Sequence, residues 1–280
     1  MSRRRRTGWP LHLAGRSRLR ALLWIAVACG AVLFLVLALR LLRGALQRDP
    51  TWARIQHDRV LRVGMDASFP PFGVVDEQGG FSGLDVDLAT ALAERWGVQA
   101  RFSNVGFDGL YDALKIGKFD LIISALPYDR TMTRDLLYSP SYFNAGQVLL
   151  ARSDDQRLRS FDDLEGKVVA VELGSEAHQL VRRLARDKGM RLEVSAQREA
   201  EQAVALLRQG QADALVCDRV TAYGYMRGTD DLCLVGEPLT DEPYVIAARP
   251  DSPLLMEQVT EALEEWRANG TLEEMLGRWF

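Results

Sequence analysis

Histidine and cysteine are scarce in this sequence, with three of each among 280 residues. The histidines, His12, His57 and His178, lie far apart along the chain and none stands beside a pair of cysteines. Transition-metal sites need several such ligands at short, regular spacings. We therefore expect no metal site, and no motif in the sequence calls for a cofactor.

Acidic residues are absent from the first 48 positions, which contain ten arginines. The remainder has 25 of the 35 Lys and Arg residues against all 38 Asp and Glu residues, a formal net charge of −13. Nucleic-acid-binding domains present a basic face to phosphates. The acidic body therefore argues against nucleic acid as a partner, and the basic head needs a separate explanation.

Charge is also absent from the apolar run between Ala21 and Leu39. As a helix rising about 1.5 Å per residue, this run would extend about 28 Å, close to the thickness of a bilayer core. Seven arginines precede it and three follow it, which favours an N-terminus inside the cell. The sequence predicts a basic cytoplasmic head (1–20), a transmembrane signal anchor (21–42) and a linker (43–57). The body is then expected on the extracytoplasmic (periplasmic) side of the cell membrane.

Two other interpretations of the N-terminus stay open. A cleaved signal peptide would have a shorter apolar region and a small-residue cleavage site. Cys29 in "AVACG" faintly resembles a lipoprotein cleavage box, although the apolar run continues beyond it.

The other cysteines, Cys217 and Cys233, lie in apolar, strand-like runs. Outside the membrane a disulfide between them is permitted, and two separately buried thiols are the alternative.

The body alternates strand and helix patterns in two blocks. The first block has strand patterns at 60–66, 98–105 and 119–126, and helix patterns at 84–97 and 107–118. The second has strand patterns at 167–174, 191–196 and 212–218, and helix patterns at 175–189 and 199–211. The closing segment predicts two helices broken near Asn269 and Gly270. Two βαβαβ blocks predict two α/β lobes, each with a mainly parallel sheet flanked by helices.

Four of the predicted strands end in polar or conformationally permissive residues, namely Asp66, Ser124, Gly174-Ser175 and Asp218. In open α/β sheets, ligands bind beyond the carboxyl ends of the strands. Two of these ends belong to each block. If the lobes face each other, the four ends line one cleft.

Several motifs follow one another in a specific order: "SFPPF", "GLDVDLA", "YSPSYF", "ALLRQGQADALVCDR" and "GTLEEMLGRWF". Together they resemble the extracytoplasmic amino-acid-binding proteins of ABC transporters, solute-binding protein family 3, over about residues 58–280. The resemblance implies a divergent member with the two-lobed, type II periplasmic-binding-protein fold. Lobe 1 would comprise 58–146 and 246–280, and lobe 2 would comprise 147–245 with the crossover strands. Such lobes close on a ligand by a hinge motion.

The resemblance also implies ligand-binding residues. Phe69 and Phe107 match two rings that pack on the ligand from opposite sides. Asp66 and Asp218 match acidic positions near the cleft, and Asp218 matches the partner of an α-ammonium group. A bond from an ammonium group to a desolvated carboxylate is strong.

Further candidates lie at strand and helix ends. Ser124 and Ala125 close the strand pattern at 119–126 and are expected to border the cleft. Ser175 begins a predicted helix, where its hydroxyl and the nearby backbone N–H groups suit a carboxylate. Its alternative role is a plain helix N-cap, and the two roles are compatible.

Three positions depart from the family pattern. The carboxylate-binding arginine of the family is replaced by Met132, and the usual Thr or Ser five residues earlier is Pro127. Glu176 adds negative charge where the carboxylate of an amino acid would lie. Arg130 is a candidate substitute for the missing arginine, Arg134 a weaker one, and two solvated surface arginines are the alternative.

The sequence therefore predicts a membrane-anchored binding protein, not an enzyme. It would capture a small polar solute, an amino acid or related carboxylate, by lobe closure for uptake through an ABC permease. One alternative is a ligand-sensing subunit that signals through another protein. A second is a cyclohexadienyl dehydratase-like enzyme, in which Glu176 would act as general acid.

Overall fold

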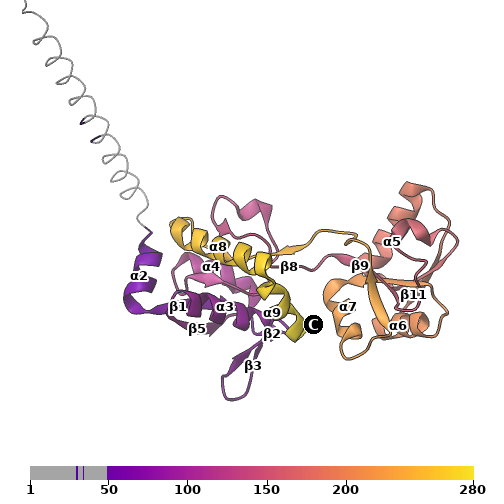
Figure 1. Cartoon of the computed structure of the whole chain (residues 1–280), viewed down its shortest axis with the longest axis horizontal. Helices are drawn as coiled ribbons and strands as arrows, with labels where there is room; N and C mark the ends of the chain where they lie inside the picture. The colour runs from indigo at the N-terminus through magenta and orange to yellow at the C-terminus, as the bar shows by residue number, and fades with distance from the viewer. Residues whose placement is uncertain (1–29, 31–33, 35–48) are drawn as a thin grey trace, which may run out of the picture. The chain divides into compact units, whose positions relative to one another are not determined.

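The computed structural model describes residues 30, 34 and 49–280 (Figure 1). Residues Asp49–Phe280 form one compact unit. The predicted cytoplasmic head and membrane-spanning segment lie outside the described residues, apart from Gly30 and Phe34. Within the part that the structure describes, no helix is long and apolar enough to cross a membrane. The signal anchor stays a prediction.

The first lobe is built on a five-stranded sheet with the strand order β5-β1-β6-β15-β7. Its strands are β1 (Val60–Met65), β5 (Gln99–Asn104), β6 (Leu121–Ile122), β7 (Leu137–Tyr138) and β15 (Ala247–Ala248). β1 pairs in parallel with β5 and β6, whereas β15 pairs antiparallel with β6 and β7. A small antiparallel sheet, β2 (Ser68–Phe69), β3 (Gly73–Val75) and β4 (Phe81–Ser82), follows β1.

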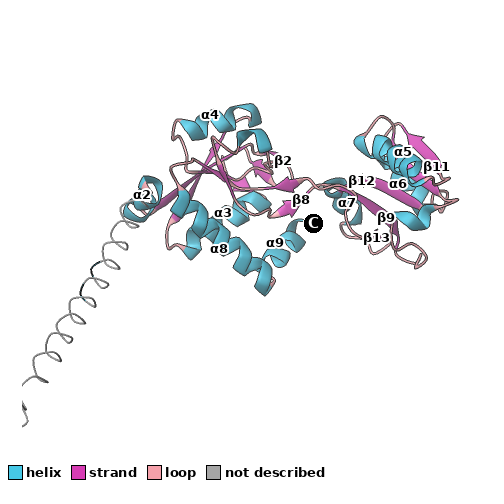
Figure 2. Cartoon of the chain, turned by 90° about the horizontal axis from the view of Figure 1, so that it is seen from above, coloured by secondary structure: helices cyan, strands magenta, loops and turns pink. Residues whose placement is uncertain are grey.

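Helices cover both faces of this sheet (Figure 2). They are α2 (Pro50–Asp58), α3 (Leu84–Arg95), α4 (Leu110–Lys115), α8 (Pro253–Asn269) and α9 (Thr271–Trp279), with the short 3₁₀ turn η1 (Phe107–Gly109) before α4. Leu121 packs with α3 and α8 on one face, and its neighbour Ile122 packs with α4 on the other, as side chains alternate along a strand. The predicted break between the last two helices is confirmed at Gly270, which ends α8 with φ 84°.

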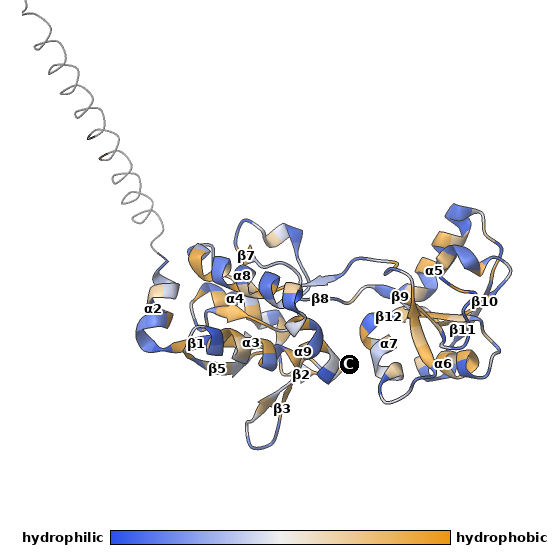
Figure 3. Ribbon diagram, viewed as in Figure 1, coloured by the Kyte–Doolittle hydropathy of each residue, from blue (hydrophilic) through white to orange (hydrophobic). Residues whose placement is uncertain are grey.

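The second lobe repeats the arrangement with the strand order β11-β10-β12-β9-β13. Its strands are β9 (Gln147–Arg152), β10 (Val168–Glu172), β11 (Glu193–Gln197), β12 (Ala214–Asp218) and β13 (Leu232–Val235). Its helices are α5 (Glu176–Lys188), α6 (Ala200–Arg208) and α7 (Arg219–Met226), with the 3₁₀ turn η3 (Phe161–Leu164). Along β9, Leu149 faces α5 and Leu150 faces α6 and α7. Apolar residues run through the strands of both lobes (Figure 3).

The two lobes are joined by a pair of crossover strands, β8 (Phe143–Asn144) and β14 (Pro243–Tyr244), which pair antiparallel. β9 follows β8 and pairs antiparallel with β12, and β15 follows β14 and pairs antiparallel with β6. One strand in each sheet, β15 in the first and β9 in the second, runs opposite to the other four. The sheets are therefore mainly parallel in strand direction, as predicted, but the prediction did not include the reversed strand, which makes two of the four pairings antiparallel. The reason is that the chain, after crossing between the lobes, enters the next sheet at the carboxyl ends of its parallel strands. The strand that follows must then run in the opposite direction to those strands.

The strand predicted at 119–126 is shorter than expected, because β6 covers only Leu121–Ile122. Ile123 still donates its backbone N–H to Gly64 at 3.2 Å. Ala125 then takes φ 42°, in the left-handed region, and an extended strand cannot continue through it. The apolar run at 119–126 marks residues that are buried, and the buried residues continue past the end of β6 to Leu126.

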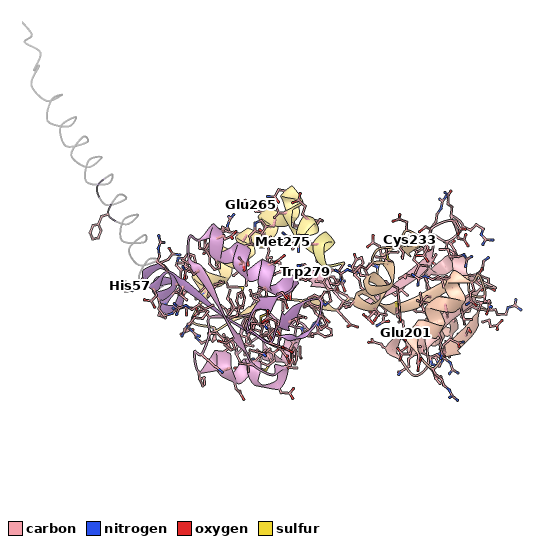
Figure 4. All side chains as sticks on the ribbon, turned by 90° about the horizontal axis from the view of Figure 1, so that it is seen from below. His57, Glu201, Cys233, Glu265, Met275 and Trp279 are labelled. Carbon is pink, nitrogen blue, oxygen red and sulfur yellow. The ribbon has the colours of Figure 1, made fainter. Side chains whose placement is uncertain are left out.

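The second half of the predicted linker is helix α2, which is fixed to lobe 1 through Asp49. The Asp49 side chain is 4 % exposed and caps α2 by accepting from the N–H of Trp52 at 2.8 Å. Its other oxygen accepts from the N–H of Leu255 in α8, also at 2.8 Å. One buried carboxylate thus holds the start of two helices. Trp279 of α9, labelled in Figure 4, similarly donates to Asp87 of α3 at 3.0 Å.

Cys217 and Cys233 are both free thiols. They lie on β12 and β13, which flank β9 on its two sides. Two strand spacings amount to about 9.6 Å, beyond the roughly 7 Å between Cα atoms that a disulfide spans. The alternative of two separate thiols is the correct one, and the disulfide is excluded by strand order.

Candidate functional site

A cavity of about 440 Å³ lies where β10 and β12 end and where α5 and α7 begin. Residues from β9, from the crossover strand β14 and from β2 complete its wall. Its volume suits a small organic molecule. Four of the predicted site residues line it, namely Phe69, Ser175, Glu176 and Asp218.

Asp218 is the last residue of β12 and the N-cap of α7. Its two oxygens accept from the N–H of Thr221 at 2.8 Å and from the Thr221 hydroxyl at 2.6 Å. These bonds hold the carboxylate in a fixed orientation at the cavity wall, and each oxygen keeps a lone pair for a further donor.

Ser175 is the N-cap of α5, as the alternative interpretation expected. Its hydroxyl accepts from the N–H of His178 at 3.1 Å and donates to the carbonyl of Glu172 at 2.8 Å. The hydroxyl proton is therefore already engaged within the protein. Glu176, the first residue of α5, is exposed to the cavity.

Phe69 projects from lobe 1 and remains 45 % exposed. Its ring stacks on Phe72, with ring centroids 5.6 Å apart and an interplanar angle of 4°. Phe72 is buried and meets Phe143 and Tyr244 of the two crossover strands edge-on, at centroid distances of 5.2 and 5.4 Å. The exposed ring is thus fixed from behind by the crossover and presents its free face at the cavity.

The other predicted residues of lobe 1 form a separate hydrogen-bonded group. The Asp66 carboxylate accepts from the Ser68 hydroxyl at 2.6 Å and from the N–H of Phe107 at 2.9 Å. The N–H of Asp66 donates to the Ser124 hydroxyl at 2.9 Å. Asp66, Phe107 and Ser124 are therefore brought together, but none of them lines the cavity, where all three were expected. Phe107 is 41 % exposed.

Ala125 also lies outside the cavity wall, and its N–H donates to Oδ2 of Asp85 at 2.7 Å. Asp85, in α3, is buried and accepts from the Tyr142 hydroxyl as well. Burial raises the pKa of Asp85 to about 7, against the lowering effect of these two hydrogen bonds.

Neither candidate arginine lines the cavity. Asp129 caps the 3₁₀ turn η2 (Arg130–Met132) by accepting from the N–H of Thr131 at 2.8 Å. This turn directs Met132 into the apolar cluster around α4 and leaves Arg130 exposed. Arg134 instead borders a surface depression with Lys115, Asp135 and Arg249. Of the interpretations drawn from the sequence, two surface arginines agree with this geometry.

Four residues that sequence reasoning missed also line the cavity: Glu172, Gln147, Glu242 and Tyr244. Glu172 ends β10 and had the same strand-end signal as Asp218. Gln147 opens β9, and Glu242 and Tyr244 belong to the return crossover. The positions of Gln147, Glu242 and Tyr244 depend on the pairing of two segments about 100 residues apart, so no local pattern marks these three residues.

Negative charge dominates the cavity. Burial raises the pKa of Glu242, and the charges of Glu176 and Asp218 and a side-chain hydrogen bond with Glu176 raise it further. Burial, followed by Glu242 and Asp218, raises the pKa of Tyr244 to about 12. Burial raises the pKa of Tyr225 to about 12, with smaller contributions from Glu201 and from Cys217, Glu172 and Asp218 of the cavity wall. Among the lining residues there are four carboxylates and no Lys, Arg or His.

A family model described as bacterial extracellular solute-binding proteins, family 3, matches residues 61–280. The chain is 27 % identical over 225 residues to the ABC transporter arginine-binding protein 1 of Escherichia coli (strain K12), covering 79 % of this chain and 90 % of that protein. It is 30 % identical over 239 residues to the L-arginine-binding protein of Pseudomonas aeruginosa, covering 82 % and 90 %. A solved structure of an ancestral cationic amino acid solute binding protein is similar with a TM-score of 0.61 and 32 % identity, covering 82 % and 99 %.

Proposed function

The chain belongs to the bacterial extracellular solute-binding proteins of family 3, and on that premise we propose that it captures a small, nitrogen-containing polar solute. The solute is an amino acid or an amine related to one, and it binds in the cavity between β10, β12 and the crossover strands. Lobe closure about β8 and β14 encloses it. The observation that carries the proposal is the position of the cavity beyond the carboxyl ends of β10 and β12, beside the hinge.

Binding without chemistry accounts for the cavity residues. Both curated relatives are named as arginine-binding proteins, and one of them is named as part of an ABC transporter. Glu176, which raised the dehydratase alternative, is an exposed first-turn residue, where a carboxylate is stabilised by the helix dipole. The proposal therefore assigns Glu176 to solute binding and gives it no catalytic role.

A thermal-denaturation screen of the full-length chain tests solute capture. The panel comprises the twenty amino acids, their decarboxylated amines and small carboxylic acids, each at 1 mM. A ligand at 100 times its Kd stabilises the folded state by about 2.7 kcal/mol and raises Tm by several degrees. A Tm that no compound raises would contradict the proposal.

The full-length protein is, in this proposal, held in the cell membrane by residues 21–42, with the body outside the cytoplasm. The run of apolar residues and the arginines on both sides of it support this topology. Protease added to intact spheroplasts is expected to digest the body and to spare the head. Release of the protein by alkaline carbonate would instead indicate a peripheral or cleaved form.

The partner in this proposal is an ABC-type permease, since one relative is named as the arginine-binding protein of an ABC transporter. Solute uptake by vesicles that contain the permease should require this chain and saturate at its binding constant. Solute binding that leaves uptake unchanged would favour the signalling alternative, in which the anchored lobes report to another membrane protein.

A further inference from the structure

The polar side chains of the cavity are dominated by hydrogen-bond acceptors. Glu172, Glu176, Asp218 and Glu242 contribute carboxylates, and no Lys, Arg or His stands among the lining residues. The hydroxyls of Ser175 and Thr221, which also line it, already donate to protein oxygens. A carboxylate on the solute would meet four negative charges and no positive side chain on the wall.

Gln147 supplies a second and independent observation. Its side chain is 5 % exposed and lines the cavity, and its Oε1 atom has no hydrogen-bond partner within the described part of the chain. The backbone N–H of Gln147 is satisfied by the Thr240 hydroxyl at 2.8 Å, so only the side chain is left open. Buried acceptors without a partner are rare in folded proteins, because desolvation without a hydrogen bond is unfavourable. The missing group is a donor, and because Gln147 lines the cavity, a donor that occupies the cavity can supply it.

The closeness of the carboxylates in the cavity wall also favours a cationic solute. Glu242 is partly buried in this wall, and after burial the charges of Glu176 and Asp218 are the causes that raise its pKa. Burial raises the pKa values of the wall tyrosines Tyr225 and Tyr244, and the charge of Asp218 is among the further causes for both. A bound cation would relieve this repulsion.

The aromatic wall is compatible with a cationic solute. The free face of Phe69 is exposed at the cavity, and its ring is held by Phe72 from behind. An aromatic face attracts an ammonium or guanidinium group and also packs against a methylene chain. Phe69 can therefore contact either end or the stem of a linear amine.

Resting on the proposed function, we propose that the solute is a small organic dication without a carboxylate, such as a diamine or an amino-guanidine. Glu176 and Glu242 bind one cationic group, and Asp218 and the Gln147 side-chain oxygen receive donors of the other. The amino acid with the same side chain is rejected, because its carboxylate lies in the field of these residues.

Matched pairs of ligands isolate the contribution of the carboxylate. Isothermal titration of the full-length chain is carried out with agmatine and arginine, cadaverine and lysine, and putrescine and ornithine. In at least one pair, the decarboxylated compound is expected to bind at least tenfold more tightly, and its affinity is expected to fall with added salt. If no pair shows tighter binding of the amine and any compound of the pairs or the wider panel binds, this inference is overturned and solute capture stays intact. If neither the pairs nor the wider panel bind, both proposals fail.

Charge-neutral variants then identify the residues involved. Glu176→Gln and Glu242→Gln are each expected to weaken amine binding at least tenfold, whereas Glu193→Gln, an exposed change on β11 outside the cavity, keeps it. Circular dichroism and Tm establish that each variant is folded. Amine affinity unchanged in both folded cavity variants overturns the assignment, and the ligand pairs on the unmodified chain test the solute class whether or not a variant folds.

Discussion

The hydroxyl of Tyr142 donates a hydrogen bond of 2.7 Å to Oδ1 of Asp85, which is 1 % exposed. Oδ2 of the same carboxyl group accepts from the N–H of Ala125, also at 2.7 Å. Tyr142 immediately precedes the crossover strand β8, and Ala125 forms the left-handed turn after β6. Asp85 therefore joins helix α3, the end of a central strand and the start of the hinge.

We expect Asp85 to make the protein less stable as the pH rises. Its pKa is about 7 in the folded protein, against an ordinary value of 3.8. The folded state therefore holds a proton that the unfolded state has lost between about pH 4 and pH 7, and stability contributed by this group falls across that window. The loss is at most ~4 kcal/mol.

Urea denaturation of the wild type and of Asp85→Asn at pH 5 and pH 8 measures this effect. An asparagine can accept from Ala125 and donate to the Tyr142 oxygen without ionising, so the variant should lose less stability between the two pH values. Glu77→Gln, an exposed change in the same lobe, serves as the control and should keep the wild-type pH dependence. Identical pH dependence in D85N and wild type would contradict the role of Asp85.

Asp120 is expected to be the most sensitive ionic position of lobe 1. It is fully buried and accepts from the N–H of Arg62 at 2.9 Å, from Nη2 of Arg62 at 2.7 Å and from the guanidinium of Arg54 in α2. Asp120→Ala leaves these donors without their acceptor and should lower the free energy of unfolding by about 3 kcal/mol. Arg54→Ala, which keeps the Arg62 bonds, should cost only about 1 kcal/mol. Equal losses in the two variants would show that Arg62 contributes nothing.

Gly64 of β1 should not tolerate a side chain. A Cβ atom at this position would lie 2.2 Å from the ring of Phe119, which is fully buried. Gly64→Ala is expected to lower the free energy of unfolding by about 2–3 kcal/mol because the core is overpacked. Gly106→Ala, where the new atom meets nothing within 4 Å, should stay within about 0.5 kcal/mol. Adding Phe119→Leu to G64A should restore part of the loss, and a double variant that is merely additive would rule out the steric cause.

Cys217 and Cys233 should both be recovered as free thiols. Without reductant, denatured protein treated with iodoacetamide is expected to carry a label on each, as mass spectrometry of the peptides will show. In the folded protein Cys217 should react very slowly, because burial raises the pKa of its thiol. A peptide pair linked through these two cysteines would contradict the strand order β12-β9-β13.

Local patterns were sufficient to predict the two α/β lobes, since helices such as α3 and α5 bury apolar residues at helical spacing and end at Gly97 and Gly189 near the predicted positions. They did not predict that half of the pairings in each sheet are antiparallel. That property depends on where the chain re-enters a sheet after crossing between lobes. The pairing of β8 with β14 joins residues about 100 positions apart, and nothing in either segment marks its partner.

The site divides in the same way. Asp218 and Ser175 could be predicted because each follows a strand and begins a helix, so the topology alone fixes its place. Glu242 lies on a crossover segment and has no such marker, although it belongs to the same acidic wall. Asp129 caps the turn Arg130–Met132, and this turn determines where both side chains point. Counting residues from the preceding strand could not predict that turn, so the sequence alone did not exclude Arg130 from the cavity.

Asp49 determines which part of the protein would bear a pulling force applied to the chain before residue 49. Because its carboxylate ties the start of α2 to the start of α8, tension on the chain before residue 49 is delivered to lobe 1 and bypasses the hinge. If the proposed anchor holds the chain at this end, lobe 1 is the lobe that stays fixed during closure and lobe 2 is the lobe that moves.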